Sequence, residues 1–80
     1  MPPQATIGRP YIMPLRIRKS AESFAVEDAG GVALAYVYFE EDPGQRGLVN
    51  RLSGVDAKAV AQAIARALTA EAVQALPLAG

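Results

Sequence analysis

The chain contains no cysteine and no histidine among its 80 residues. Without cysteine it can form no disulfide, and without either residue the usual zinc sites are excluded. A Ser-His-Asp triad is excluded as well, because no histidine is present to act as the base. Domains of this size bury only about 60% of their unfolded surface and often rely on disulfides, metals or oligomerisation. Oligomerisation is the device that this composition leaves open.

An excess of either charge is also missing, since eight basic residues balance eight acidic ones. This balance argues against a large nonspecific phosphate-binding surface, which needs clustered excess Lys and Arg. No apolar run is long enough to span a membrane, and the first residues lack the apolar core of a signal peptide. We therefore expect a cytoplasmic protein.

The acidic cluster Glu40-Glu41-Asp42 is the one candidate for acid–base chemistry. It precedes Pro43-Gly44, a strong turn signal, and is read as a solvated turn. No nucleophile–base pair, calcium-binding loop or phosphate-binding glycine loop is apparent. The sequence therefore predicts no catalytic residue, no cofactor site, no metal site and no enzymatic activity.

The chain divides into a short arm and one domain. Residues 1–11 are punctuated by proline and glycine without any period and predict a disordered arm, whereas residues 12–80 form a single domain. Within it, the alternation around Leu15 and Ile17 predicts a first strand, "SFAVED" a second and "VALAYVYF" a third.

The turn "DAGG" between the second and third strands fits a type I turn followed by a left-handed glycine. This turn places Asp28 opposite Val32 and, by extension, Phe24 opposite Tyr36. Paired residues share a face, so the predicted core comprises Leu15, Ile17, Phe24, Val26, Leu34, Tyr36 and Tyr38. A two-residue Gly-Gly turn would shift the register by one and exchange the two faces of the third strand.

A helix is predicted from about Gly54 to Leu68, with Ser53 as its N-cap. At about 100° per residue, Val60, Ile64 and Leu68 fall on one apolar side and are expected to pack on Phe24, Leu34 and Tyr36. The apolar phase breaks near Thr69. Either the helix ends there, or a short extra C-terminal helix follows with Val73 and Leu76 facing inward. Residues 45–52 are expected to form a loop.

The order strand, strand, strand, helix predicts an α+β fold: a small three-stranded antiparallel sheet with one helix packed on one face. The opposite face then carries an apolar strip that one helix leaves uncovered. This candidate interface consists of Ala33, Ala35, Val37 and Phe39. An exposed apolar strip is typical of an interface, which favours a homo-oligomer, most simply a two-fold dimer. The alternative is that residues 70–78 fold back over it.

The sequence does not define a biochemical role, but it favours a self-associating or protein-interaction module. The alternative is a small nucleic-acid-binding domain that presents its sheet to DNA through Arg16, Arg18 and Lys19. The zero net charge and the alanine-rich sheet face argue against nucleic acid, because base reading needs Arg, Asn or Gln there. The plain reading of these basic residues is a polar strand edge that prevents aggregation.

The runs "FAVEDAGG" from Phe24, "ALAYVYFE" from Ala33 and "RLS" from Arg51, followed by the alanine-rich helix, resemble a family of short hypothetical bacterial proteins. That family carries a V-x-D-x-x-G-x-x-L-A-Y-x-Y-F core and an R-L-[ST] segment leading into a helix that closes on Leu-Pro. The resemblance covers about residues 18–68 and implies no activity. The chain departs from the pattern at its C-terminus, where Leu76-Pro77 comes late, after "TAEAVQA".

Overall fold

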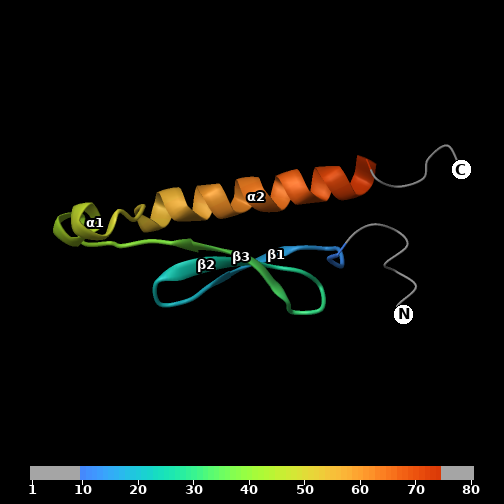
Figure 1. The fold of residues 1–80 in the computed structure, drawn as a ribbon, viewed down its shortest axis with the longest axis horizontal. Helices are drawn as coiled ribbons and strands as arrows, with labels where there is room; N and C mark the ends of the chain where they lie inside the picture. The colour runs from blue at the N-terminus through green and yellow to red at the C-terminus, as the bar shows by residue number, and fades with distance from the viewer. Residues whose placement is uncertain (1–9, 75–80) are drawn as a thin grey trace, which may run out of the picture.

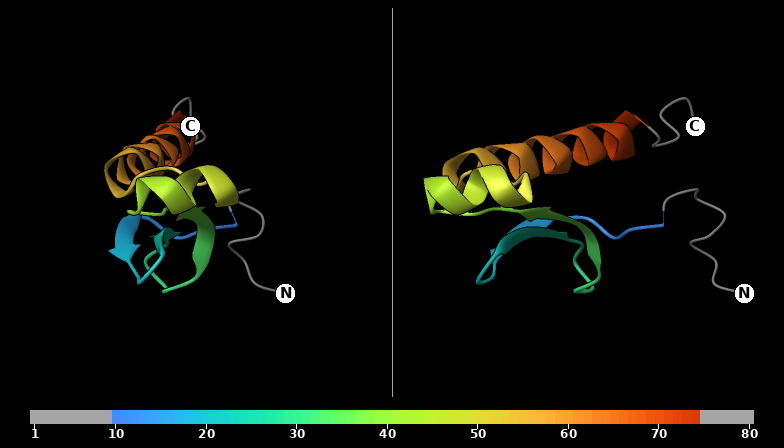
Figure 2. Two further views of the ribbon diagram at one scale, coloured as in Figure 1. Left: turned by 90° about the vertical axis from the view of Figure 1, so that its left-hand side faces the viewer. Right: turned by 60° about the vertical axis from the view of Figure 1, so that its left-hand side comes forward.

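The computed structural model describes residues 10–74 as a curved sheet with a long helix along one face (Figure 1, Figure 2). The sheet is antiparallel in the order β1-β2-β3. The elements are β1 (Arg16–Lys19), β2 (Ser23–Glu27), β3 (Ala33–Tyr38), α1 (Pro43–Val49) and α2 (Gly54–Gln74). The predicted α+β class, with three antiparallel strands and a helix on one face, is confirmed.

A tight turn joins β1 to β2 and sets the first register. Ser20 donates its backbone N–H to the Ser23 carbonyl at 2.8 Å, and Ile17 lies opposite Val26 and Lys19 opposite Phe24. Paired residues share a face. Ile17 and Lys19 therefore lie on the helix side of β1, and Arg16 and Arg18 on the other side.

The turn between β2 and β3 has the predicted geometry. Asp28 donates its N–H to the Val32 carbonyl at 2.9 Å, and Gly31 donates to the Asp28 carbonyl at 3.0 Å. Gly31 has φ 86°, in the left-handed region that favours glycine.

The register predicted beyond this turn is wrong, because a β-bulge intervenes. Glu27 pairs with Ala33, but Val26 pairs with Ala35, so Leu34 is an extra residue in β3. From there onward the register is the one that a two-residue turn would have produced, and the faces of β3 are exchanged.

The exchanged faces correct both the core and the candidate interface. Ala35, Val37 and Phe39 lie under α2, with Phe39 only 5% exposed. Tyr36 points away from α2 and is 56% exposed. Of the four predicted interface residues only Ala33, opposite Glu27, stays on the far face. The predicted apolar strip therefore does not exist there.

The core lies between α2 and the sheet. Its buried residues are Phe24, Val26, Phe39, Ala57 and Ala61, and the half-buried residues packed against them are Leu15, Ile17, Ala35, Val37, Ile64 and Ala65. Ile64, Leu15 and Ile17 were predicted correctly, whereas Val60 is 40% exposed. The fully buried positions of α2 in this core are alanines, which let the helix approach the two phenylalanines closely.

α2 continues unbroken to Gln74, so the predicted end at Leu68 and the short extra C-terminal helix are both wrong. Ala72 is buried and Val73 is 54% exposed, the reverse of the inward Val73 that was expected. Tyr11 donates its hydroxyl to the Leu68 carbonyl at 2.9 Å. Tyr11 therefore belongs to the folded domain, whereas residues 1–9 and Leu76 lie outside the described residues.

The segment expected to be a loop contains the short helix α1. Asp42 is its N-cap and accepts the Gly44 N–H at 2.9 Å, Pro43 occupies the first turn, and Asn50 closes it with φ 54°. Leu52 then forms a parallel bridge with Phe39, and its carbonyl accepts the Glu40 N–H at 2.8 Å. This bridge ties the start of α2 to the end of β3.

The alanines of α2 give a direct test of the helix–sheet contact. Ala61 is fully buried, so an Ala61→Leu side chain overpacks the contact and should lower the free energy of unfolding by about 1–3 kcal/mol. The same change at the exposed Ala63 should alter it by no more than about 0.5 kcal/mol. Urea unfolding of the two variants measures both values, and equal effects would contradict the core described above.

Candidate functional site

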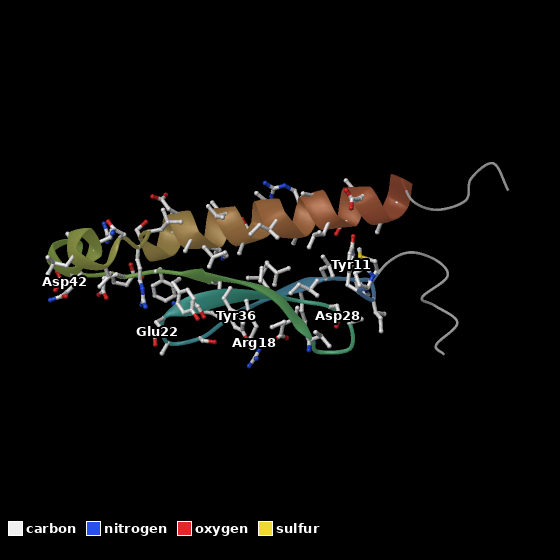
Figure 3. The ribbon with its side chains drawn as sticks, in the orientation of Figure 1. Tyr11, Arg18, Glu22, Asp28, Tyr36 and Asp42 are labelled. Atoms are coloured by element: carbon white, nitrogen blue, oxygen red, sulfur yellow. The ribbon has the colours of Figure 1, made fainter. Side chains whose placement is uncertain are left out.

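The face of the sheet opposite α2 is polar and aromatic rather than apolar. We call it the Tyr/Arg face, and it consists of Arg16, Arg18, Ser23, Ala25, Glu27, Tyr36 and Tyr38, with Arg51 at its margin. Arg18 and Tyr36 lie on the side of the sheet away from α2 (Figure 3). β1 supplies the arginines and β3 the tyrosines, while β2 runs between them.

β2 is buried even on this face. Ser23, Ala25 and Glu27 are 4%, 1% and 3% exposed, although none of residues 10–74 forms a second layer over them. Ala25 lies in a cross-strand row between Arg18 and Tyr36, whose long side chains shield it from both edges. The edge strands therefore cover the centre of the sheet with their own side chains.

The Glu27 carboxylate holds the two arginines in place. Arg18 Nε donates to Glu27 Oε2 at 2.7 Å, and Arg16 Nε lies 3.4 Å from Oε1. The carboxylate is 3% exposed, but the arginine side chains are 64–66% exposed. A buried carboxylate needs such partners, because a buried charge without one is strongly destabilising. The guanidinium groups are thus fixed at one end and presented to solvent.

The two tyrosines form the aromatic half of the face. Their ring centroids are 6.3 Å apart with an interplanar angle of 28°, and Tyr38 is 48% exposed. The Arg51 guanidinium lies 4.9 Å from the Tyr38 ring centroid, a cation–π geometry. Arg51 also donates to Glu22 Oε1 at 2.8 Å. The exposed aromatic area is therefore bordered by positive charge.

The predicted nucleic-acid residues are only partly brought together. Arg16 and Arg18 share the Tyr/Arg face, but Lys19 lies on the helix side, its ammonium 5.9 Å from the Phe24 centroid and 5.7 Å from that of Phe39. There it borders an open depression of about 240 Å³ beside the start of α2. The sequence argument missed Tyr36 and Tyr38 as surface residues, although the Tyr-x-Tyr alternation would have revealed the pair in the correct register.

The acidic cluster takes part in backbone contacts. The Glu40 carboxylate accepts the Asp42 N–H at 3.2 Å, Asp42 caps α1, and Glu41 Oε1 accepts the Gly54 N–H at 3.2 Å at the start of α2. Within residues 10–74, no group of three Asp or Glu side chains is arranged to hold a metal ion. The chemistry that these residues offer is structural capping.

The fold and this face define a small α+β protein with one helix-covered and one Tyr/Arg sheet face. Searches of protein-family models, curated proteins and solved structures found no match to the chain. No helix in the described part of the chain is long and apolar enough to cross a membrane.

Asp28 fixes the turn beside the Tyr/Arg face. Its Oδ1 accepts the N–H groups of Gly30 and Val32 at 2.9 and 3.0 Å, and its Oδ2 accepts that of Ile12 at 3.1 Å. The hydrogen bonds from Val32 and Ile12, with a smaller one from Gly30, hold the pKa of Asp28 below its usual 3.8, against the opposing effect of burial.

A lowered folded-state pKa means that ionised Asp28 stabilises the fold at pH values above about 4, its unfolded pKa, and that this contribution disappears as the pH falls through the folded-state pKa. Asp28→Asn should therefore be least stable relative to wild type near neutral pH, and the difference should shrink below about pH 4.

The measurement is urea unfolding of both proteins at pH values from about 2.5 to 7. Glu71→Gln, which removes an exposed carboxylate of α2, is the matched control. A difference between wild type and Asp28→Asn that is independent of pH would contradict the role of the charge.

Proposed function

We propose that this protein is a small protein-interaction module, without catalytic activity of its own, that binds its partner through the Tyr/Arg face. The observation that carries the proposal is the exposed Tyr36–Tyr38 pair beside two arginines that a buried carboxylate holds in place. Tyr and Arg are enriched among the residues that dominate binding energy at protein interfaces.

The face is organised before any partner arrives. β2 beneath it is fully buried, and Glu27 restrains both arginines, so binding would order few additional side chains. Tyrosine also contributes a large contact area while losing only two side-chain torsions. A preorganised surface of this kind gives more affinity for its area, because the entropy cost of ordering is already met.

The charges on the face indicate the partner's chemistry. Arg51 lies over the Tyr38 ring, and Arg16 and Arg18 lie across β2 from the tyrosines. The partly compensating acids are Glu22 and Glu27. Arginine binds carboxylates through paired N–H donors, and the tyrosine rings pack against apolar or aromatic side chains. A peptide or protein surface that combines carboxylates with apolar side chains fits both halves.

Single-stranded nucleic acid is the second candidate, and the tyrosine pair favours it. Two neighbouring tyrosine rings with an arginine over one of them can stack unpaired bases, which an alanine-rich face could not do. Against it stand the zero net charge, the acids Glu22 and Glu27 that pair with the arginines, and the position of Lys19 on the opposite side. The protein partner is therefore the better supported candidate.

The test replaces both exposed rings. Tyr36→Ala/Tyr38→Ala should weaken binding of a captured and purified partner by at least about thirtyfold, the effect of losing one strong interface residue, measured by calorimetry. Val55→Ala removes an even more exposed apolar side chain, at the start of α2, and should leave the affinity unchanged. Equal affinity for both variants would refute the proposal.

Fluorescence anisotropy with a labelled single-stranded oligonucleotide separates the two candidates. Binding that depends on the tyrosines and weakens steeply with salt would replace the protein partner by nucleic acid, since phosphate contacts release counterions. Absence of oligonucleotide binding at low salt would exclude nucleic acid and support the protein-interaction proposal.

A further inference from the structure

The outer edge of β3 presents backbone groups directed away from the sheet. Phe39 donates its N–H inward to the Glu22 carbonyl, whereas Glu40 donates outward to Leu52. Since this direction alternates along a strand, the N–H and C=O groups of Tyr36 and Tyr38 also point outward. Among the described residues, β3 pairs with β2 on one side, and on the other side Leu52 bridges to Phe39 and takes up the edge from Tyr38 onward. The stretch left open to another strand is therefore the one around Tyr36.

The two edges of the sheet differ in charge. Three of the four residues of β1 are basic, namely Arg16, Arg18 and Lys19, and such an edge repels a second copy of itself. β3 reads "ALAYVY" and carries no charged residue at all. A neutral edge strand with open backbone groups is suited to pairing with another strand.

α2 extends this neutral edge with an apolar flank. Lys58 borders the same depression as Lys19, so that flank of the helix lies toward β1. Val60, two residues or about 200° further round the helix, therefore lies toward β3. Val60 is 40% exposed, and Leu52, which bridges to β3, is 41% exposed. Apolar side chains thus continue from the edge of the sheet to the helix above it.

We infer that the partner at this edge is a second copy of the chain, joined by antiparallel β3–β3 pairing across Tyr36. Antiparallel pairing about a two-fold axis perpendicular to the sheet uses identical groups on both copies and puts both α2 helices on the same side. The Val60 flank of one chain then faces the Val60 flank of the other. The β3 edge of each copy carries no charged side chain, so no charge repulsion opposes this pairing.

This inference rests on the proposed function in that it names one protein partner, but it uses the β3 edge rather than the Tyr/Arg face. Pairing would join the two Tyr/Arg faces into one six-stranded surface, with the tyrosine pairs of both copies at its centre. A dimer of this kind therefore enlarges the binding face without covering it.

Sedimentation equilibrium of wild type and Val60→Lys tests the inference. The wild type should show twice the 8.4 kDa chain mass at micromolar concentration, and Val60→Lys should raise the dissociation constant at least about tenfold by placing like charges across the axis. Val73→Lys is the control, because Val73 is 54% exposed but lies about 220° away round the helix. It should remain dimeric.

A second pair of variants tests the strand pairing itself. Tyr36→Pro removes the outward N–H and should dissociate the dimer, while the inner bonds to β2 are retained. Tyr36→Thr removes the ring but keeps the N–H, so it should dimerise, and circular dichroism verifies that both are folded. A wild type that is monomeric at micromolar concentration, or equal effects of Val60→Lys and Val73→Lys, would overturn the inference. If Val60→Lys loses the dimer but still binds a protein partner, the Tyr/Arg face binds that partner without dimerisation.

Discussion

The Asp28 carboxylate and the bulge that follows it determine which side of β3 meets the helix. Three backbone N–H groups converge on this one side chain and fix the turn from Asp28 to Val32. The turn alone would direct Tyr36 toward the helix, but the extra residue Leu34 shifts the remaining strand by one position. Every other property of the two faces follows from that shift, because strand side chains alternate.

The two faces solve the problem of a very small sheet in different ways. On one face, Val37 and Phe39 meet a helix whose buried positions are alanines, so the sheet and the helix come close together. On the other, arginines and tyrosines from the edge strands lie over the buried centre of β2 and leave their polar ends in water. This second covering needs no additional layer and at the same time creates the surface that we propose for binding.

The sequence allowed the strands, the Asp28–Val32 turn, the start of α2 and the α+β class to be predicted, since each depends on local pattern and turn chemistry. The bulge at Leu34 could not be predicted, because the hairpin rules count the residues of the turn and carry no signal for an extra residue inside the strand. Without the bulge, Tyr36 and Tyr38 were assigned to the core, and Val37 and Phe39 to the exposed face. The candidate site was therefore predicted from the wrong residues. The helical phase also misled at Thr69, since α2 buries alanines rather than the larger side chains of Val60 and Val73.

The register of β3 can be measured directly in solution by nuclear Overhauser effects between Hα protons. Opposed residues that are not hydrogen-bonded to each other bring their Cα atoms to about 4.5 Å, close enough for a strong Hα–Hα signal. The bulged register predicts that signal between Ala25 and Tyr36. Hydrogen-bonded and non-hydrogen-bonded pairs alternate along the ladder, and counting from the hydrogen-bonded Glu22–Phe39 pair makes Ala25–Tyr36 a non-hydrogen-bonded pair. A strong signal between Ala25 and Ala35 instead would mean that β3 has no bulge, and would place the tyrosines under the helix.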